Sequence, residues 1–352
     1  MKTLTAPFLL AVSALMGGGC AGPGPAAITN GRGVYLDVIN RTDDEQLLAI
    51  VVRKRYDETF GMLAVSSVTA SMKLGGSIGA NAGVGSANSY EGNLVPLSAG
   101  VVYEENPTVS YTPMRGEKFI ERMLAPVSAE QALLLCRMST AEVEVLRLII
   151  RRVNGLANPL YSSLPASEGF GRFVTLYTRL RERGKLDFVR SERGEYELLL
   201  HDYTAEDAVE VGELLRTLGV DRGAAGGPVA VPVRFFVGSP EKRGVDLETP
   251  SALEVIEAAA GGVEVPEEHL ADGLARPLRS SGSAGLFTVH SSASRPLHAA
   301  VAVQHKGWWY FVDARDTASK QGFAILRTLV GMRLDDAHQG QPAPVLTVPV
   351  GG

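Results

Sequence analysis

The stretch that decides the fold is LHAAVAVQHKGWWYFVDARD, residues 297–316. Apolar residues alternate with small or polar ones before Lys306–Gly307, through Val301 and Val303, and an alternating aromatic run follows it. Period-2 alternation on both sides of a two-residue loop predicts a β-hairpin. A helical pattern follows directly, so hairpin strands and helices occur next to each other along this chain.

Other helices and strands are predicted on both sides of the hairpin, without a strict β-α-β rhythm. Helical spacing of apolar residues predicts helices over 43–58, 116–127, 130–138, 141–156, 171–186, 205–219, 247–262 and 316–334, and alternation predicts strands over 68–74, 100–113, 195–203 and 229–238. Thr42 and Glu45 match a capping box that starts the first of these helices. The mixture predicts an α+β fold with small antiparallel sheets.

Composition limits the class of protein. The 352 residues are 45% hydrophobic and 21% charged, as in an ordinary globular protein. The length and the change of pattern predict two domains, 33–137 and 138–352. The formal net charge of −5 gives no basic excess for a nucleic-acid partner. Two Cys exclude a disulfide framework and the six His lack metal-ligand spacing, so we expect neither a metal nor another cofactor.

The N-terminal sequence MKTLTAPFLLAVSALMGGGC is typical of a secretory signal peptide. Lys2 precedes an apolar core over residues 8–16, and three Gly separate this core from Cys20. The core is shorter than the roughly 20 residues that a membrane-spanning helix needs. We therefore expect residues 1–19 to be removed. Residues 20–32 are rich in Gly, Pro and Ala, which predicts a flexible tether.

Cys20, placed directly after small residues, resembles the lipobox of bacterial lipoproteins, although Gly17 stands where that family usually has Leu. The resemblance implies that Cys20 becomes the first mature residue and carries the lipid, with acyl chains such as palmitate as the membrane anchor. Ala21 follows Cys20 in place of Asp, which by the same resemblance implies sorting to the outer membrane, with the body facing the periplasm.

The hairpin itself resembles the His-to-Asp hairpin of the transglutaminase-like cysteine peptidase superfamily, with His298 opening one strand and Asp313 closing the next. That chemistry needs a Cys nucleophile on a helix shortly upstream, and residues 251–269 contain no Cys. One hypothesis is therefore a degenerate hydrolase or peptide-binding module that keeps His298 and Asp313 as remnants. The other is a core hairpin without a catalytic role.

Charged residues gather directly after the hairpin. Asp313, Arg315, Asp316 and Lys320 precede or open the last predicted helix, and helix N-termini bind anions. A ligand-binding site for an anion, with Lys320 reaching over it, is one interpretation. The alternative is that Asp316 or Thr317 caps the helix and that the other residues form a solvated surface.

Residues 63–111 alternate in polarity over more than the ~9–11 residues of a membrane-crossing strand. One hypothesis is a hairpin contributed to an oligomeric envelope pore or to a secretion or export assembly. The more economical alternative is a small sheet packed under the helices that begin near Asp43 and Gly116, and this sheet is what we expect.

Three motifs, NRTDDEQLLAIVVRKRY, ENPTVSYTPMRGEKF and GWWYFVDARDTASKQGFAILRTL, resemble an uncharacterised family of bacterial envelope lipoproteins. The resemblance implies a location and no activity. The sequence thus predicts a lipid-anchored cell-envelope protein with a structural or protein-interaction role. We expect a membrane contact through the lipid, an envelope protein as partner, and no catalysis.

Overall fold

The computed structural model describes residues 23–80, 97–114, 117–138, 142–162, 168–221, 227–235, 243–277 and 286–338. The chain divides into two units, the first comprising Met1–Thr42, Ala64–Thr112 and Ala343–Gly352, and the second comprising Asp43–Leu63 and Pro113–Pro342. Each unit combines segments that are distant in sequence, and the predicted boundary between residues 137 and 138 stays a prediction. The predicted signal peptide, residues 1–19, and Cys20 lie outside the described residues.

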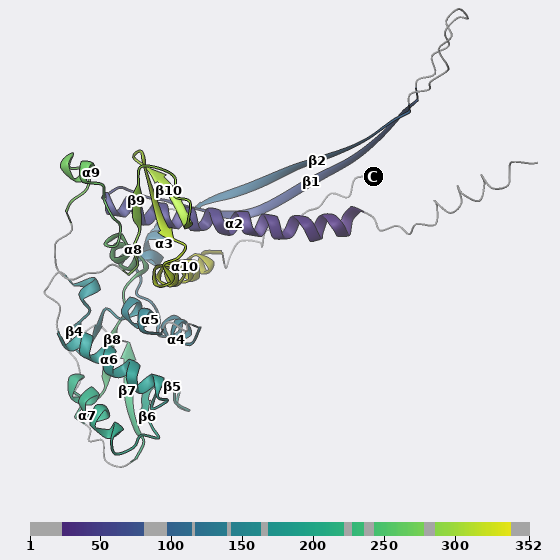
Figure 1. The fold of residues 1–352 in the computed structure, drawn as a ribbon. Helices are drawn as coiled ribbons and strands as arrows, with labels where there is room; N and C mark the ends of the chain where they lie inside the picture. Colours follow the sequence, from purple (N-terminus) through teal and green to yellow (C-terminus); the bar gives the residue numbers. More distant parts are fainter. Residues whose placement is uncertain are drawn as a thin grey trace, which may run out of the picture. The chain divides into compact units, whose positions relative to one another are not determined.

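The first unit contains a long β-hairpin and the beginning of a long helix (Figure 1). Strands β1 (Met62–Ala80) and β2 (Leu97–Met114) form a two-stranded sheet, which confirms both predicted strands and extends them. Pro107 lies within β2 and is tolerated because each strand of a two-stranded sheet has an edge without a ladder partner. Most of this hairpin belongs to the first unit, whereas residues 43–55 of α2 and the helix that begins at Glu117 belong to the second, so a sheet packed under these helices stays a prediction.

Helix α2 (Pro23–Arg55) begins earlier than predicted. Most of the segment expected to be a tether is helical, and Pro suits a first helical turn because its missing N–H is not needed there. Thr42 lies inside this helix, and its hydroxyl donates to the carbonyl oxygen of Ile39 at 2.9 Å. A Thr that satisfies its hydroxyl on the preceding turn fits a helix interior. The predicted capping box at Thr42 is therefore wrong.

The second unit contains a six-stranded mixed sheet with strand order β4-β3-β8-β7-β6-β5. Its strands are β3 (Arg152–Val153), β4 (Leu156–Ala157), β5 (Leu186–Arg190), β6 (Tyr196–Leu200), β7 (Val229–Phe235) and β8 (Val245–Glu248). Neighbours are antiparallel except for the parallel pair β7–β8. Helices α6 (Glu168–Glu182) and α7 (Asp207–Thr217) pack on each other, and Phe173 and Tyr177 of α6 line a cavity together with Leu198 and Val233 of the sheet.

One helix of this unit ends earlier than predicted. Helix α5 spans Glu142–Ile149, whereas the apolar pattern predicted it over 141–156. Asn154 (φ +44°) and Gly155 (φ +83°) form the two-residue turn between β3 and β4 instead. Asn-Gly suits this turn because both positions need a positive φ. The Asn154 amide also donates to the carbonyl oxygen of Leu218 at 2.6 Å, which ties the turn to the end of α7.

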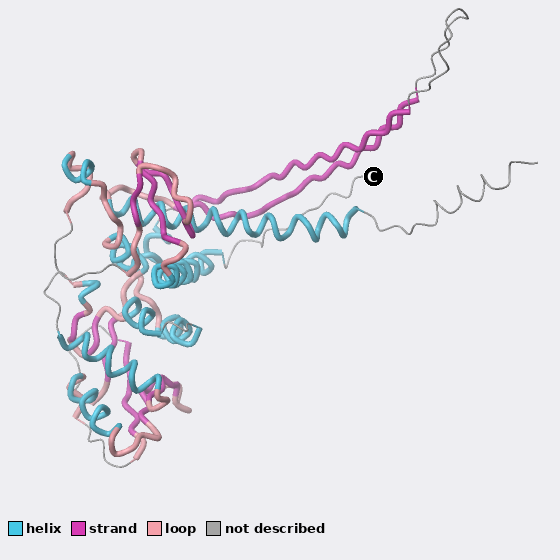
Figure 2. Tube along the Cα trace, in the orientation of Figure 1, coloured by secondary structure: helices cyan, strands magenta, loops and turns pink. Residues whose placement is uncertain are grey.

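The same unit contains a three-stranded antiparallel sheet of order β10-β11-β9 (Figure 2). Its strands are β9 (His290–Ser292), β10 (Ala299–His305) and β11 (Trp308–Asp313). The second unit also contains the helices α3 (Glu117–Leu124), α4 (Ala129–Met138), η1 (Pro159–Tyr161), α8 (Ala252–Ala260), α9 (Glu267–Ala271) and α10 (Thr317–His338). Tyr310 and Val312 of β11 and Leu326 and Leu329 of α10 are buried core residues.

The α+β prediction is confirmed, because helices, an antiparallel sheet and a mixed sheet occur in one chain. Within the residues that the structure describes, no helix combines the length and the apolar composition needed to cross a bilayer.

Candidate functional site

The predicted hairpin is confirmed as β10 and β11. His305 pairs with Trp308 across the turn formed by Lys306 (φ +47°) and Gly307 (φ +85°). Two consecutive positive φ values define the turn that suits the twist of a two-residue hairpin. The turn thus places His305, Lys306 and Trp308 at one end of the hairpin, and Tyr310 lies two residues further along β11.

A buried polar cluster lies at this turn end and joins three segments that are distant in sequence. The Tyr56 hydroxyl, from the last turn after α2, lies 2.6 Å from Nδ1 of His269 and 2.5 Å from the hydroxyl of Tyr310. All three residues are at most 5% exposed. A hydroxyl has one proton, so Tyr56 donates to one of these partners and accepts from the other.

Aromatic and charged side chains enclose this cluster. The His305 ring meets the Tyr56 ring edge to face, with 5.2 Å between centroids. Nζ of Lys306 lies 2.8 Å from the Glu58 carboxylate, and the same carboxylate lies 3.4 Å from Nε2 of His305. Trp308 donates its indole N–H to Glu268 on α9. The hairpin turn is therefore fixed both to the end of α2 and to α9.

Burial sets the protonation states in this cluster. Desolvation raises the pKa of Tyr56 and raises the pKa of Tyr310 far above its usual range, so both phenols stay neutral. Desolvation also lowers the pKa of His305, more than the nearby Glu58 carboxylate raises it. The two neutral phenols and His269 form a hydrogen-bonded chain that holds three segments together.

His298 and Asp313 lie at the opposite end of this hairpin. His298 is exposed, and its backbone carbonyl accepts from the N–H of Ala314 at 3.1 Å. A carboxylate oxygen of Asp313 accepts from the N–H of Arg315 at 2.8 Å. Within the described residues the two side chains make no hydrogen bond to each other. The structure thus supplies no oriented His–Asp pair, and the transglutaminase-like hypothesis stays a prediction without a supporting contact.

The charged residues after the hairpin divide into one helix cap and a partly solvated surface. The Asp316 carboxylate accepts from the backbone N–H and the hydroxyl of Ser319, at 3.0 and 2.6 Å. These bonds lower the pKa of Asp316. Asp316 therefore caps α10 with its own carboxylate, in the place where an anion was predicted. Arg315 is exposed and Lys320 half-buried, so these two stay unconfirmed as ligand-binding residues.

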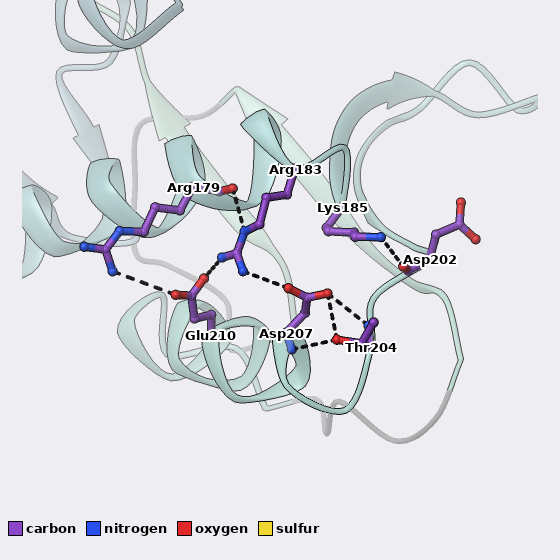
Figure 3. Close-up of polar contacts among 7 residues, drawn as sticks. All are labelled: Arg179, Arg183, Lys185, Asp202, Thr204, Asp207 and Glu210. Atoms are coloured by element: carbon purple, nitrogen blue, oxygen red, sulfur yellow. Dashed lines mark hydrogen bonds and ion pairs between the residues drawn. The ribbon is translucent and has the colours of Figure 1, made fainter.

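A second polar cluster, not predicted from the sequence, fastens α6 to α7 (Figure 3). Arg183 donates to Asp207 at 2.8 Å and also to Glu210. The backbone N–H of Thr204 donates to the Asp207 carboxylate at 3.0 Å, and the Asp207 N–H donates to the Thr204 hydroxyl at 3.3 Å. These two bonds are reciprocal, as in a capping box, and tie Thr204 to the first residue of α7, although Asp207 stands where that motif has Glu or Gln.

His201 lies beside that cluster, between two carboxylates. Its Nδ1 is 2.9 Å from Asp202 and its Nε2 is 2.8 Å from Asp187. Arg181 donates to the other oxygen of Asp187. Hydrogen bonds to Asp202 and then to Asp187 raise the pKa of His201. The contact with Asp187 depends on pairing between β5 and β6, and β5 was not predicted, whereas Asp202 directly follows His201 in the sequence.

The described residues contain no group of three His, Cys, Asp or Glu side chains arranged to hold a metal ion. Cys136 lines an apolar cavity of about 40 Å³ together with residues of α5, α6 and the six-stranded sheet. No protein-family model matches this sequence, and neither a curated protein nor a solved structure matches it.

Proposed function

We propose that this protein is a lipid-anchored component of the cell envelope that works by binding other protein chains. The anchor is Cys20, placed after a signal-like leader, and the body faces the periplasm from the outer membrane. A single acyl chain holds a protein only marginally, so the several chains that bacterial lipoproteins carry are needed for stable attachment.

The observation that carries the interaction role is the β1–β2 hairpin. Its strands have 19 and 18 residues, and among the described residues the sheet that they form consists of these two strands. At roughly 3.3 Å per residue, β1 is about 60 Å long. A two-stranded ribbon is marginally stable in water, and each strand has an outer edge of backbone donors and acceptors. At the start of β1, the Gln46 side chain bonds both backbone groups of Leu63. A partner strand would therefore stabilise the hairpin, and the hairpin has the backbone groups to bind one.

The same observation favours a second candidate, a subunit of an oligomeric pore or export assembly. Both strands are longer than the ~9–11 residues that suffice to cross a membrane. In this candidate, hairpins from several copies pair edge to edge. The two candidates differ in the partner, which is another envelope protein in the first and further copies of this chain in the second.

The anchor is tested by fractionating cells that express Cys20→Ala, with Cys136→Ala as the matched cysteine control. We expect Cys20→Ala in the soluble periplasmic fraction, because one acylated thiol provides the attachment. Cys136→Ala should stay with the membranes. Retention of Cys20→Ala on membranes after a carbonate wash would contradict the proposed anchor.

The hairpin is tested with the full-length protein solubilised in a mild detergent. Light scattering after gel filtration gives the mass of the complex, and mass spectrometry identifies its chains. Thr69→Pro removes one backbone donor from β1 and should release the partner, whereas Thr69→Val keeps the donor and should retain it. A wild-type preparation that contains one copy and no second protein would contradict both candidates.

A further inference from the structure

Strand β10 is an edge of the three-stranded sheet, and its outer side carries unpaired backbone groups. The closing pair His305↔Trp308 of a two-residue hairpin is hydrogen-bonded, and hydrogen-bonded pairs then alternate along the register through Val303↔Tyr310. The N–H and C=O groups of Ala302 and Gln304 therefore point away from β11. In the part of the chain that the structure describes, these groups have no backbone partner.

This edge lacks most of the devices that prevent strand pairing. The seven residues of β10 include no Pro, Asp, Glu, Lys or Arg, the residues that usually protect an edge. An irregularity in register lies between Ala299 and Val301, so the regular edge is confined to 301–305. A partner strand of three or four residues fits this length.

On the outer face of the sheet, the side chains of β10 are smaller than the aromatic side chains of β11 beside them. Ala302 lies opposite Phe311, and Gln304 lies opposite Trp309. Both rings are partly exposed. A strand added beside β10 places alternate side chains next to Ala302, where a small neighbour leaves room for a large apolar side chain to reach the Phe311 ring.

A cation lies on the same sheet, over Trp309 of the central strand β11. The guanidinium of Arg295 lies over the Trp309 ring, 5.4 Å from its centroid. Arg295 is exposed and, among the described residues, has no carboxylate partner. An Arg held against an aromatic ring keeps its donors available for a carboxylate from another molecule.

We propose that β10 binds an extended segment of a partner protein as a fourth strand, with an acidic residue directed to Arg295 and large apolar residues at alternate positions. A second copy of β10 fits less well, because its own outer face carries Ala300, Ala302 and Gln304 and no carboxylate. This surface is formed by other strands than the β1–β2 hairpin, so the inference goes beyond the proposed function and stands if that proposal fails.

The probe is the labelled peptide acetyl-Asp-Thr-Leu-Thr-Leu-Thr-amide, in which Asp and both Leu share one face. Binding to the full-length protein in detergent is measured by fluorescence anisotropy. A control peptide carries N-methyl groups on both Leu, which removes the donors that face β10 and keeps the side chains. We expect binding of the first peptide and at least about tenfold weaker binding of the second.

Variants of the protein locate the contact. Ala302→Pro removes one outward N–H and should weaken binding about tenfold, whereas Ala302→Ser keeps the N–H and should bind within about twofold of wild type. Arg295→Gln should weaken binding about threefold, and this loss should vanish with an Asn-for-Asp peptide. Circular dichroism checks the fold of Ala302→Pro. The peptide comparison, made on the wild-type protein, does not depend on that variant.

Three results would overturn the proposal. The first is equal binding of the methylated and unmethylated peptides, and the second is no binding at all. The third is a change in the mass of the peptide-free protein on Ala302→Pro, which would assign the edge to a second copy of this chain.

Discussion

Replacing His201 by Gln should destabilise the protein at pH 6 and leave its stability almost unchanged at pH 9. Both ring nitrogens of His201 face carboxylate oxygens, and ionised carboxylates only accept hydrogen bonds. Both nitrogens must therefore carry a proton, which makes the imidazole a cation. The raised pKa of His201 has the same cause, since hydrogen bonds to Asp202 and Asp187 favour the charged form.

The sign of the pH dependence follows from the raised pKa. A group that binds its proton more tightly in the folded state stabilises that state fully below its unfolded pKa, about 6.5 for His. The stabilisation is lost as the pH rises through the higher, folded pKa. The Asp202 side chain is 84% exposed, so the surrounding water screens that contact. The contact with Asp187 is partly buried and contributes about 0.5–1 kcal/mol when His201 is charged.

The assay is urea unfolding of wild type and His201→Gln at pH 6, 7, 8 and 9. We expect a difference of about 0.5–1 kcal/mol in the free energy of unfolding at pH 6, falling toward zero at pH 9. His298→Gln is the matched control, because His298 is exposed, and it should show no such trend. A difference for His201→Gln that is constant or grows with pH would refute the assignment of a doubly bonded imidazolium.

Five further substitutions test the packing. Tyr310→Phe removes one hydrogen bond and should cost about 1 kcal/mol of unfolding free energy, whereas Tyr56→Phe leaves two buried groups unpaired and should cost about 2–3 kcal/mol; the reverse order in urea unfolding would contradict the cluster. Val245→Ile adds one methylene to the wall of the apolar cavity and should raise the melting temperature, with a gain of about 0.8 kcal/mol. Val231→Ile, at a buried residue that does not line that cavity, should lower the melting temperature by overpacking. Asn154→Ala removes an amide bonded to two carbonyl oxygens and puts Ala at positive φ, so a loss of about 3 kcal/mol or more is expected in the same unfolding assay; a loss under about 1 kcal/mol would show that the turn is not fixed by this amide.

The β10–β11 hairpin was predictable because its information is local. Alternation and a two-residue turn lie within fifteen residues, from Ala299 to Asp313, and no distant contact is needed to form them. The Asn154–Gly155 turn carried an equally local pattern. It was missed because the apolar residues around it fit helical spacing, and β3 exists through pairing with the distant strand β8.

The polar cluster at Tyr56 was not predictable in this way. Tyr56 and His269 are 213 positions apart, and Tyr56 and Tyr310 are 254 positions apart, so no spacing rule connects them. The sequence analysis singled out the hairpin that contains Tyr310, but through a resemblance based on His298 and Asp313. The buried polar contacts of this hairpin lie at its turn end, because the turn is the part of the hairpin that contacts α9 and the end of α2.

The link between Tyr56 and Tyr310 also bears on the order in which the chain folds. A contact that spans 254 positions forms late, because closing so long a loop is entropically costly and requires nearly the whole polypeptide. If the chain crosses a membrane from its N-terminus, Tyr56 emerges long before the strand that pairs with it. A chain truncated ahead of residue 299 should leave this phenol hydrated, and the fluorescence of Trp308 and Trp309, the two Trp of the chain, should report the closure during refolding as a slow final phase.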